Sequence, residues 1–109
     1  MVDPTVVSGV RSYLRRLGEH GFAVSFGVVF GSQVTGNADQ WSDIDLLVVS
    51  PRFDQRIVRE DINVLWRLAA RTDNRIEPFP CGERQWEEDT ASPIIEIARS
   101  AGTRVAFEE

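Results

Sequence analysis

The sequence predicts a single α+β domain that fills residues 1–109. Apolar residues recur at helical spacing near the start of the chain, whereas short runs rich in Val, Phe and Ile occur around its centre. A chain of 109 residues can bury one hydrophobic core, but it is too short to hold a catalytic domain and a separate acceptor domain. We therefore expect one compact unit that acts on a partner.

The first half of the chain predicts one helix and two strands. Asp3 is a suitable N-cap and Pro4 a suitable first helical residue, and the helix is expected to end near Gly18 or Gly21. Its expected core face consists of Val6, Val7, Val10, Leu14 and Leu17. The strands are expected at Phe22–Phe30 and Asp43–Ser50, joined by a polar connection over Gln33–Ser42 and ended by Pro51. Trp41 is expected to cap the core beside the second strand, with stacking on an adenine as the alternative.

The second half predicts two longer helices, a third strand and two short terminal elements. After a loop through Asp54, a helix follows in which Val58, Ile62, Leu65, Trp66 and Ala69 are spaced for burial. Arg75–Cys81 is the third strand, and it should lie at a sheet edge because Pro78 and Pro80 lack N–H donors. Glu83–Asp89 is expected as a short, solvated acidic helix rather than a second metal site. A helix from Ser92-Pro93 to Gly102, with Ile94, Ile95, Ile97 and Ala98 inward, and a short strand over Thr103–Phe107 complete the prediction.

Composition excludes several classes of function. The net charge of −5 argues against a general nucleic-acid binder, which needs a basic face to displace the counterions of phosphate. All twelve basic residues are arginine, so a Walker-type phosphate lysine and Schiff-base chemistry are both excluded. The single cysteine, Cys81, allows neither an intrachain disulfide nor a cysteine-rich zinc site, and a reducing cytoplasm is the simplest location. Neither a secretion signal nor a membrane span is expected.

Two aspartates and a Gly-Ser pair carry the chemistry. Asp43 and Asp45 share a face of the predicted strand, because residues i and i+2 lie on the same side. Two carboxylates so placed repel one another, and they are most easily held together by a hard cation such as Mg²⁺, which leaves room for substrate phosphates. Gly31 and Ser32 supply turn N–H groups and a hydroxyl, which suit phosphate. The pattern indicates a metal with a triphosphate.

The position of the apolar run separates this motif from similar ones. Haloacid-dehalogenase-type phosphatases and Asp-x-Asp glycosyltransferases place their aspartates after an apolar strand, whereas here the apolar residues Leu46–Val49 follow them. A calcium-binding loop is excluded because Leu47 and Val48 stand where metal ligands and a glycine belong. The remaining alternative is an ordinary charged strand start that follows a turn.

The central motif consists of a Gly-Ser pair, ten further residues, and then Asp-x-Asp before an apolar run. It resembles the signature of the minimal nucleotidyltransferases, small members of the polymerase-beta-like superfamily. Gly31, Ser32, Asp43 and Asp45 occupy the matching positions, and Ser42 and Leu46 also fit. The resemblance implies the nucleotidyltransferase fold, a small mixed β-sheet flanked by helices. It also implies ATP at the Gly-Ser turn, two Mg²⁺ ions at the aspartates, and a third carboxylate on a later strand. Glu77 is the best candidate, as the only acid in an extended apolar segment downstream.

The same resemblance implies AMP transfer from ATP to a hydroxyl. Small members of the family are often paired with a HEPN-domain partner in toxin–antitoxin modules, and some transfer AMP to a tyrosine of that partner. One departure is that Val34-Thr35-Gly36 stands where family members often carry Ala-Arg-Gly. This favours an alternative, a catalytically idle protein that neutralises its partner by binding alone. The three acids Asp43, Asp45 and Glu77 favour the enzyme.

Overall fold

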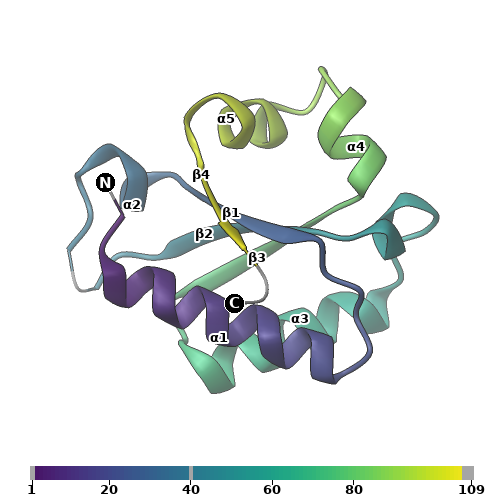
Figure 1. Cartoon of the computed structure of the whole chain (residues 1–109), viewed down its shortest axis with the longest axis horizontal. Coiled ribbons are helices and arrows are strands. Elements are labelled where there is room, and N and C mark those ends of the chain that lie inside the picture. Colours follow the sequence, from purple (N-terminus) through teal and green to yellow (C-terminus); the bar gives the residue numbers. More distant parts are fainter. Residues whose placement is uncertain (1, 40, 107–109) are drawn as a thin grey trace.

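A four-stranded mixed sheet forms the centre of the computed structural model, which describes residues 2–39 and 41–106 (Figure 1). The strand order is β3-β2-β1-β4, with β1 antiparallel to both neighbours and β2 parallel to β3. This confirms the predicted fold class. The elements in chain order are α1 (Pro4–Glu19), β1 (Phe26–Phe30), α2 (Ser32–Thr35), β2 (Ile44–Val49), the 3-10 turn η1 (Pro51–Asp54), α3 (Arg59–Thr72), β3 (Ile76–Cys81), α4 (Glu83–Glu88), α5 (Pro93–Ala101) and β4 (Thr103–Ala106).

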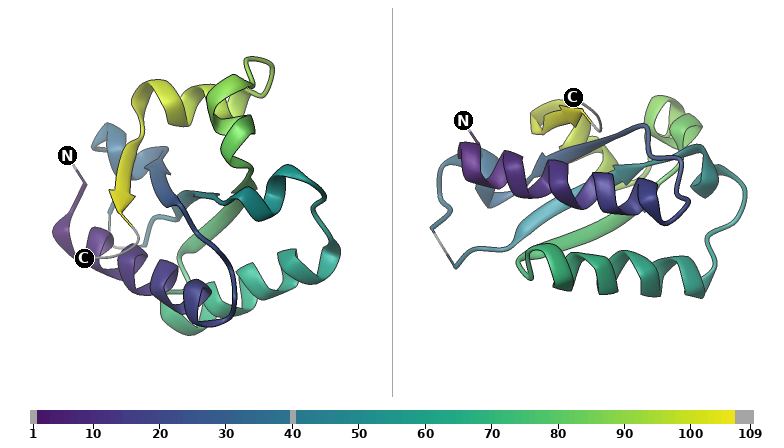
Figure 2. Two further views of the ribbon diagram at one scale, coloured as in Figure 1. Left: turned by 45° about the vertical axis from the view of Figure 1, so that its right-hand side comes forward. Right: turned by 60° about the horizontal axis from the view of Figure 1, so that its bottom comes forward.

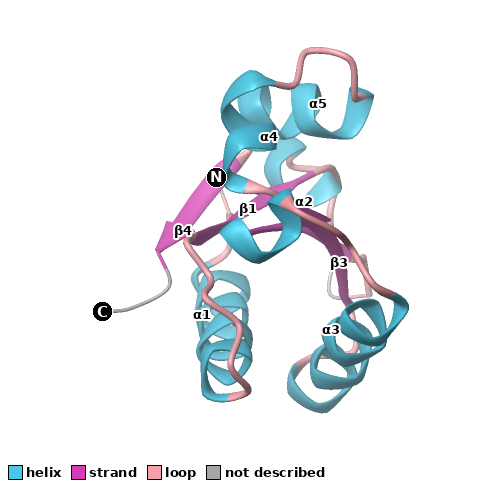
Figure 3. Ribbon diagram, turned by 90° about the vertical axis from the view of Figure 1, so that its right-hand side faces the viewer, coloured by secondary structure: helices cyan, strands magenta, loops and turns pink. Residues whose placement is uncertain are grey.

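Helices cover both faces of the sheet, α1 and α3 on one side and α4 and α5 on the other (Figures 2 and 3). The alternation of side chains along β2 decides which residue faces which layer. Leu46 and Val48 belong to the buried cluster that includes α1 and α3, whereas Leu47 and Val49 belong to the cluster that includes Ile95 of α5. Asp45 lies two residues before Leu47, so its side chain is on the same face of the sheet, the one that α4 and α5 cover.

The first helix begins as predicted and carries one core residue that was not predicted. The N–H of Thr5 donates to the Asp3 carboxylate at 2.8 Å, and Pro4 follows the cap. Tyr13 is fully buried, and its hydroxyl donates to the Leu65 carbonyl at 2.9 Å. Burial raises the pKa of this phenol well above its usual range, so it stays a neutral donor. This bond ties α1 to α3.

The third strand lies at the sheet edge, as its prolines predicted. Ser50 donates its N–H to the Cys81 carbonyl at 3.0 Å, and Ile44 donates to the Arg75 carbonyl at 2.8 Å. The odd-numbered residues of β3 thus bond to β2, and the peptide groups of Pro78 and Pro80 face outward. No helix in the described part of the chain is long and apolar enough to cross a membrane.

Several predicted boundaries were wrong. The first strand begins at Phe26 rather than Phe22, because residues 22–25 form the return from α1, with Phe22 packed on Phe53 at a ring-centroid distance of 6.1 Å. Gly31 is followed by the short helix α2 instead of an irregular polar connection. The second strand begins at Ile44, so Asp43 directly precedes it. The final strand was predicted to reach Phe107, which lies outside the described residues.

Several predicted core residues are exposed. Trp41 is 79% exposed and caps no core, and Trp66 is 45% exposed. In α3 the buried side is narrower than predicted and includes Asp61, whose carboxylate is paired with Arg52 at 2.9 Å. Exposure also exceeds a third at Val58, Ile94 and Ile97. In α5 only Ile95 and Ala98, three positions apart, are buried.

Candidate functional site

Gly31 joins the end of β1 to α2 in a conformation that requires glycine. Its φ of 78° and ψ of −146° are strained for any residue with a Cβ, and an added Cβ would overlap the Asp45 carboxylate. The turn therefore lies directly against the predicted metal ligand. Ser32, half-buried, is the first residue of α2. The N–H groups of Val34 and Thr35 donate to the Gly31 carbonyl at 3.0 and 3.2 Å, which leaves the N–H groups of Ser32 and Gln33 without an intrahelical partner. These groups and the Ser32 hydroxyl are suitable donors for a phosphate.

Three carboxylates meet at one end of β2 and β3. Asp45 is in register with Phe30 on one side and with Glu77 on the other. Register partners on neighbouring strands share a face, and the strands are about 4.8 Å apart. Asp43 precedes Asp45 by two positions and is exposed. The two aspartates and Glu77 are thus close enough to interact, and Asp43 contributes to the raised pKa values of both Asp45 and Glu77.

Asp45 and Glu77 have raised pKa values. Burial raises the pKa of Asp45, and the charge of Asp43 raises it further. Burial also raises the pKa of Glu77, followed by hydrogen bonding to Asp43 and by the charges of both aspartates. The hydrogen bond between Asp45 and Glu77 lowers the pKa of the first and raises that of the second, so a shared proton favours Glu77. The cluster carries uncompensated negative charge that a cation would relieve.

A Mg²⁺ ion fits the donor chemistry of the cluster, since this cation prefers carboxylate oxygens and binds alongside phosphate. The side chains are not already closed around such an ion. Among residues 2–39 and 41–106, no group of three His, Cys, Asp or Glu side chains is arranged to hold a metal. Glu77 is instead hydrogen-bonded to both aspartates.

Gln33 of α2 is a site residue that the sequence analysis missed. It is 6% exposed, and its side-chain amide donates to the carbonyls of Asp43 at 3.1 Å and Ser42 at 3.4 Å. The residue after the Gly-Ser pair therefore holds the backbone of the first aspartate. Its only signal in the sequence is its place next to Ser32, which does not distinguish it from an exposed loop residue.

Hydrogen bonds within the loop before Asp43 also hold that loop in place. The Asp39 carboxylate accepts from the Trp41 N–H at 2.9 Å, and the Asp39 N–H donates to the Ser42 hydroxyl at 3.0 Å. Such side-chain bonds stabilise turns without regular structure. The Trp41 ring itself is open to solvent, and its alternative role of stacking on a base stays a prediction.

An apolar surface adjoins the acids on the same face of the sheet. Phe30 and Phe79 pack with ring centroids 5.7 Å apart, and Phe79 stands in register with Leu47, two positions along from Asp45. Phe79 is half-buried. The rings thus adjoin Asp45 and Glu77 on this face of the sheet, in agreement with the burial that raises the pKa values of these two acids.

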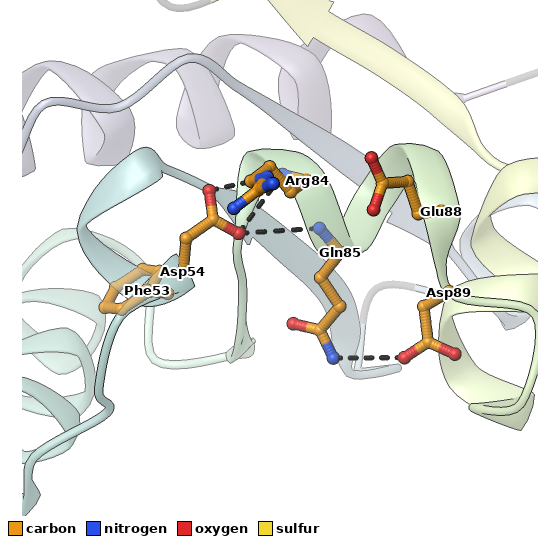
Figure 4. Close-up of a pocket in the computed structure, with 6 residues that line it drawn as sticks. All are labelled: Phe53, Asp54, Arg84, Gln85, Glu88 and Asp89. Carbon is orange, nitrogen blue, oxygen red and sulfur yellow. Dashed lines mark hydrogen bonds between the residues drawn. The ribbon is translucent and has the colours of Figure 1, made fainter.

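A separate hollow of about 540 Å³ lies between η1 and α4, and it does not belong to this site (Figure 4). It is at the other end of β2, because η1 follows the last residue of that strand. In Figure 4 the Asp54 carboxylate faces the start of α4, where it accepts from the N–H of Arg84 at 3.1 Å and of Gln85 at 3.4 Å. Asp54 thus replaces the side chain that Gly82 cannot supply as N-cap. The hollow therefore lies at the contact between η1 and α4.

Comparison with known proteins agrees with the fold. A family model described as a nucleotidyltransferase domain matches residues 7–107. No curated protein sequence matches the chain significantly.

Two solved structures share the fold at low sequence identity. A protein from Sulfolobus solfataricus, described as a candidate nucleotidyltransferase, superposes with a TM-score of 0.65 at 13% identity, over 90% of this chain and 77% of that one. A toxin–antitoxin structure with AMP-PNP superposes with a TM-score of 0.62 at 17% identity, over 94% of this chain and 74% of that one.

Proposed function

The chain belongs to the nucleotidyltransferase domain family, and we propose that it transfers AMP from ATP, with Mg²⁺, to a hydroxyl of a partner protein, as the antitoxin of a HEPN-type toxin. The observation that carries this proposal is the register of Asp45 with Glu77, directly against the Gly31 turn. The structure with AMP-PNP, a neighbour in fold, supports a nucleotide substrate and a protein partner.

Each residue of the site has a role in this reaction. Asp43, Asp45 and Glu77 would hold two Mg²⁺ ions, which supply positive charge to the phosphates and lower the pKa of the attacking hydroxyl. The Gly31 turn and the Ser32 hydroxyl bind the β- and γ-phosphates and keep the leaving group in line. Glu77 accepts the hydroxyl proton as the new oxygen–phosphorus bond forms at the α-phosphate. The bond to pyrophosphate breaks, and AMP remains on the acceptor.

The acceptor is expected to come from outside the chain. The sheet and its helices account for residues 4–106, so a separate acceptor domain is not found within that range. Free RNA is a poor acceptor for a chain with a net charge of −5. A protein hydroxyl, and a tyrosine in particular, fits better, and a cytoplasmic location suits both ATP and such a partner.

A second candidate is a catalytically idle protein that neutralises its partner by binding. Thr35 favours it, since this residue stands where related proteins often have an arginine, and its hydroxyl is turned back to the Ser32 carbonyl at 3.5 Å. A nucleotide would then meet no cation from the chain at this position.

Mass spectrometry after incubation with labelled ATP, Mg²⁺ and the product of the neighbouring gene tests the two candidates. The transferase predicts a mass increase of one AMP unit on a partner tyrosine, abolished by Asp45→Asn and slowed by Glu77→Gln, because an amide cannot accept the proton. Mg·ATP at about a hundred times its Kd would stabilise the enzyme by roughly 2.7 kcal/mol. Absence of thermal stabilisation by both Mg·ATP and Mn·ATP would identify the idle binder, and transfer to tRNA alone would contradict the protein acceptor.

A further inference from the structure

The helix α3 and its N-cap carry a partly exposed apolar stripe, of which Ile62 also packs against the core. Val58, Ile62 and Trp66, which we call the α3 stripe, follow one another at intervals of four residues, so they lie along one side of the helix start. Val58 is 38% exposed, Trp66 is 45% exposed, and Ile62 is half-buried. The stripe spans about 12 Å, or a little over two helical turns. Exposed large apolar side chains grouped in this way mark interaction sites more often than isolated ones.

The charge around the α3 stripe is opposite to that of the rest of the chain. Residues 55–72 contain four arginines and two acids and so have a net charge of +2. The chain as a whole has a net charge of −5, so the other residues together carry −7. One of these acids, Asp61, is buried and already paired with Arg52. The four arginines are exposed, and none makes a salt bridge to another residue that the structure describes; they are Arg56, Arg59, Arg67 and Arg71. A partner with acidic groups complements this surface.

The sheet edge above α3 cannot accept a strand from a partner. The helix packs beneath β3 (Figure 3), whose outward peptide groups belong to Ile76, Pro78 and Pro80. The prolines have no N–H, and the N–H of Ile76 donates to the Asp73 carbonyl at 3.0 Å. Strand addition requires free donors along the edge. A partner segment at this place therefore has to satisfy its backbone internally, as a helix does.

We propose that the α3 stripe is the docking surface for an amphipathic, acidic helix of the partner protein. Apolar side chains of that helix cover Ile62 and Trp66, and its carboxylates pair with the surrounding arginines. The inference rests on the proposed function for the existence of a partner. It adds that affinity comes from the α1/α3 layer, while the acceptor hydroxyl reaches Glu77 around the β3 edge, because the edge strand β3 both carries Glu77 and packs on α3.

A second copy of the chain fits the α3 stripe less well. The acidic helix of the chain is α4, and it has only six residues. Its large apolar side chain, Trp86, packs on Phe26 with ring centroids 5.6 Å apart and is also contacted by the Arg99 guanidinium. This helix has no free apolar side to offer.

Binding measurements without nucleotide, using the product of the neighbouring gene, test the proposal. Titration calorimetry should show that Trp66→Ser weakens the Kd about 30-fold, the effect of losing one interface anchor. The matched control is Trp41→Ser, which removes a more exposed tryptophan, 79% against 45%, from the loop before β2 and should leave the Kd within about twofold. Arg59→Glu combined with Arg67→Glu should slow association about tenfold at low salt and abolish most of its salt dependence.

Three results would overturn the proposal. The wild type and Trp66→Ser could bind with the same Kd, only Trp41→Ser could lose binding, or the wild type could fail to bind. Concentration-dependent dimers that Trp66→Ser dissolves would assign the stripe to a second copy, and binding to anionic phosphatidylserine vesicles in place of the protein would assign it to a membrane. The charge variants keep the test valid if Trp66→Ser fails to fold. AMP transfer with a Kd insensitive to Trp66→Ser contradicts this inference alone, whereas docking at α3 without transfer contradicts the transfer reaction alone.

Discussion

Replacing Gly31 by alanine should damage stability and function together, because the same Cα position determines both. Alanine at φ 78° and ψ −146° costs about 1–3 kcal/mol in backbone strain. The overlap of the new Cβ with the Asp45 carboxylate adds about 1–3 kcal/mol, typical of overpacking. We expect a loss near 4 kcal/mol in the free energy of unfolding, a large part of the roughly 5–15 kcal/mol available to a domain.

Gly36 provides a matched control. It also has a positive φ, 87°, but an added Cβ there would meet nothing within 4 Å. Gly36→Ala should therefore cost only about 1 kcal/mol. With a urea m value near 2 kcal/mol/M, the midpoint of unfolding should fall by about 2 M for Gly31→Ala and about 0.5 M for Gly36→Ala. Only Gly31→Ala should lose the stabilisation by Mg·ATP.

A double-mutant cycle separates the two costs of Gly31→Ala, the backbone strain and the overlap with the Asp45 carboxylate. Asp45→Ala removes the overlapping carboxylate, so adding it to Gly31→Ala should restore part of the lost stability and leave only the backbone strain. If Gly31→Ala and Gly36→Ala cost the same, and if the cycle shows no coupling, then Asp45 does not pack against the turn and the geometry of the site is wrong.

Three further predictions concern Gln33, the acid cluster and Asp54. Gln33→Leu leaves two backbone carbonyls without their donor and should cost about 1–3 kcal/mol in urea unfolding, with a lower rate of AMP transfer. The raised pKa values of Asp45 and Glu77 mean that the folded chain binds protons more tightly than the unfolded chain, so without metal the melting temperature should rise as the pH falls from 7 towards 5, and Asp45→Asn should reduce that rise. A melting temperature that falls steadily over this range would contradict the repulsion. Asp54→Ala uncaps α4 and should cost about 1 kcal/mol while leaving transfer unchanged, because the cap is at the opposite end of β2.

The placement of the two aspartates on one side of β2 was predictable because it follows from strand parity alone. The third acid, Glu77, was proposed only because the resemblance implies one on a later strand, and its register with Asp45 depends on strand pairing. The prolines of β3 likewise predicted an edge without any knowledge of its neighbours. The shared side of the aspartates and the edge position of β3 depend on spacing within one segment, which a sequence displays directly.

The features that sequence reasoning missed depend on contacts between distant segments. Tyr13 is buried because Leu65 offers a carbonyl, and α4 begins at Gly82 because Asp54 supplies the missing cap. Helical spacing predicted that Trp66 is in the core. The sheet and α1 bury only a narrower side of α3, the side that carries Leu65 and Leu68. Periodicity shows which residues share a side of a helix, and the width of the covered arc depends on the neighbours.

The pairing of β1 with β4 has a consequence for how the site is assembled during synthesis. Phe26 pairs with Ala106, about 80 residues later in the chain, whereas β1 and β2 are close in sequence. Pairings so distant form late, after the local hairpin and the crossover through α3. Until residues 103–106 have left the ribosome, the strand that carries Gly31 has an unpaired edge, which other nascent chains can bind. A translational pause before residue 103 would therefore expose this strand to mispairing, although every predicted metal and phosphate ligand has already been made.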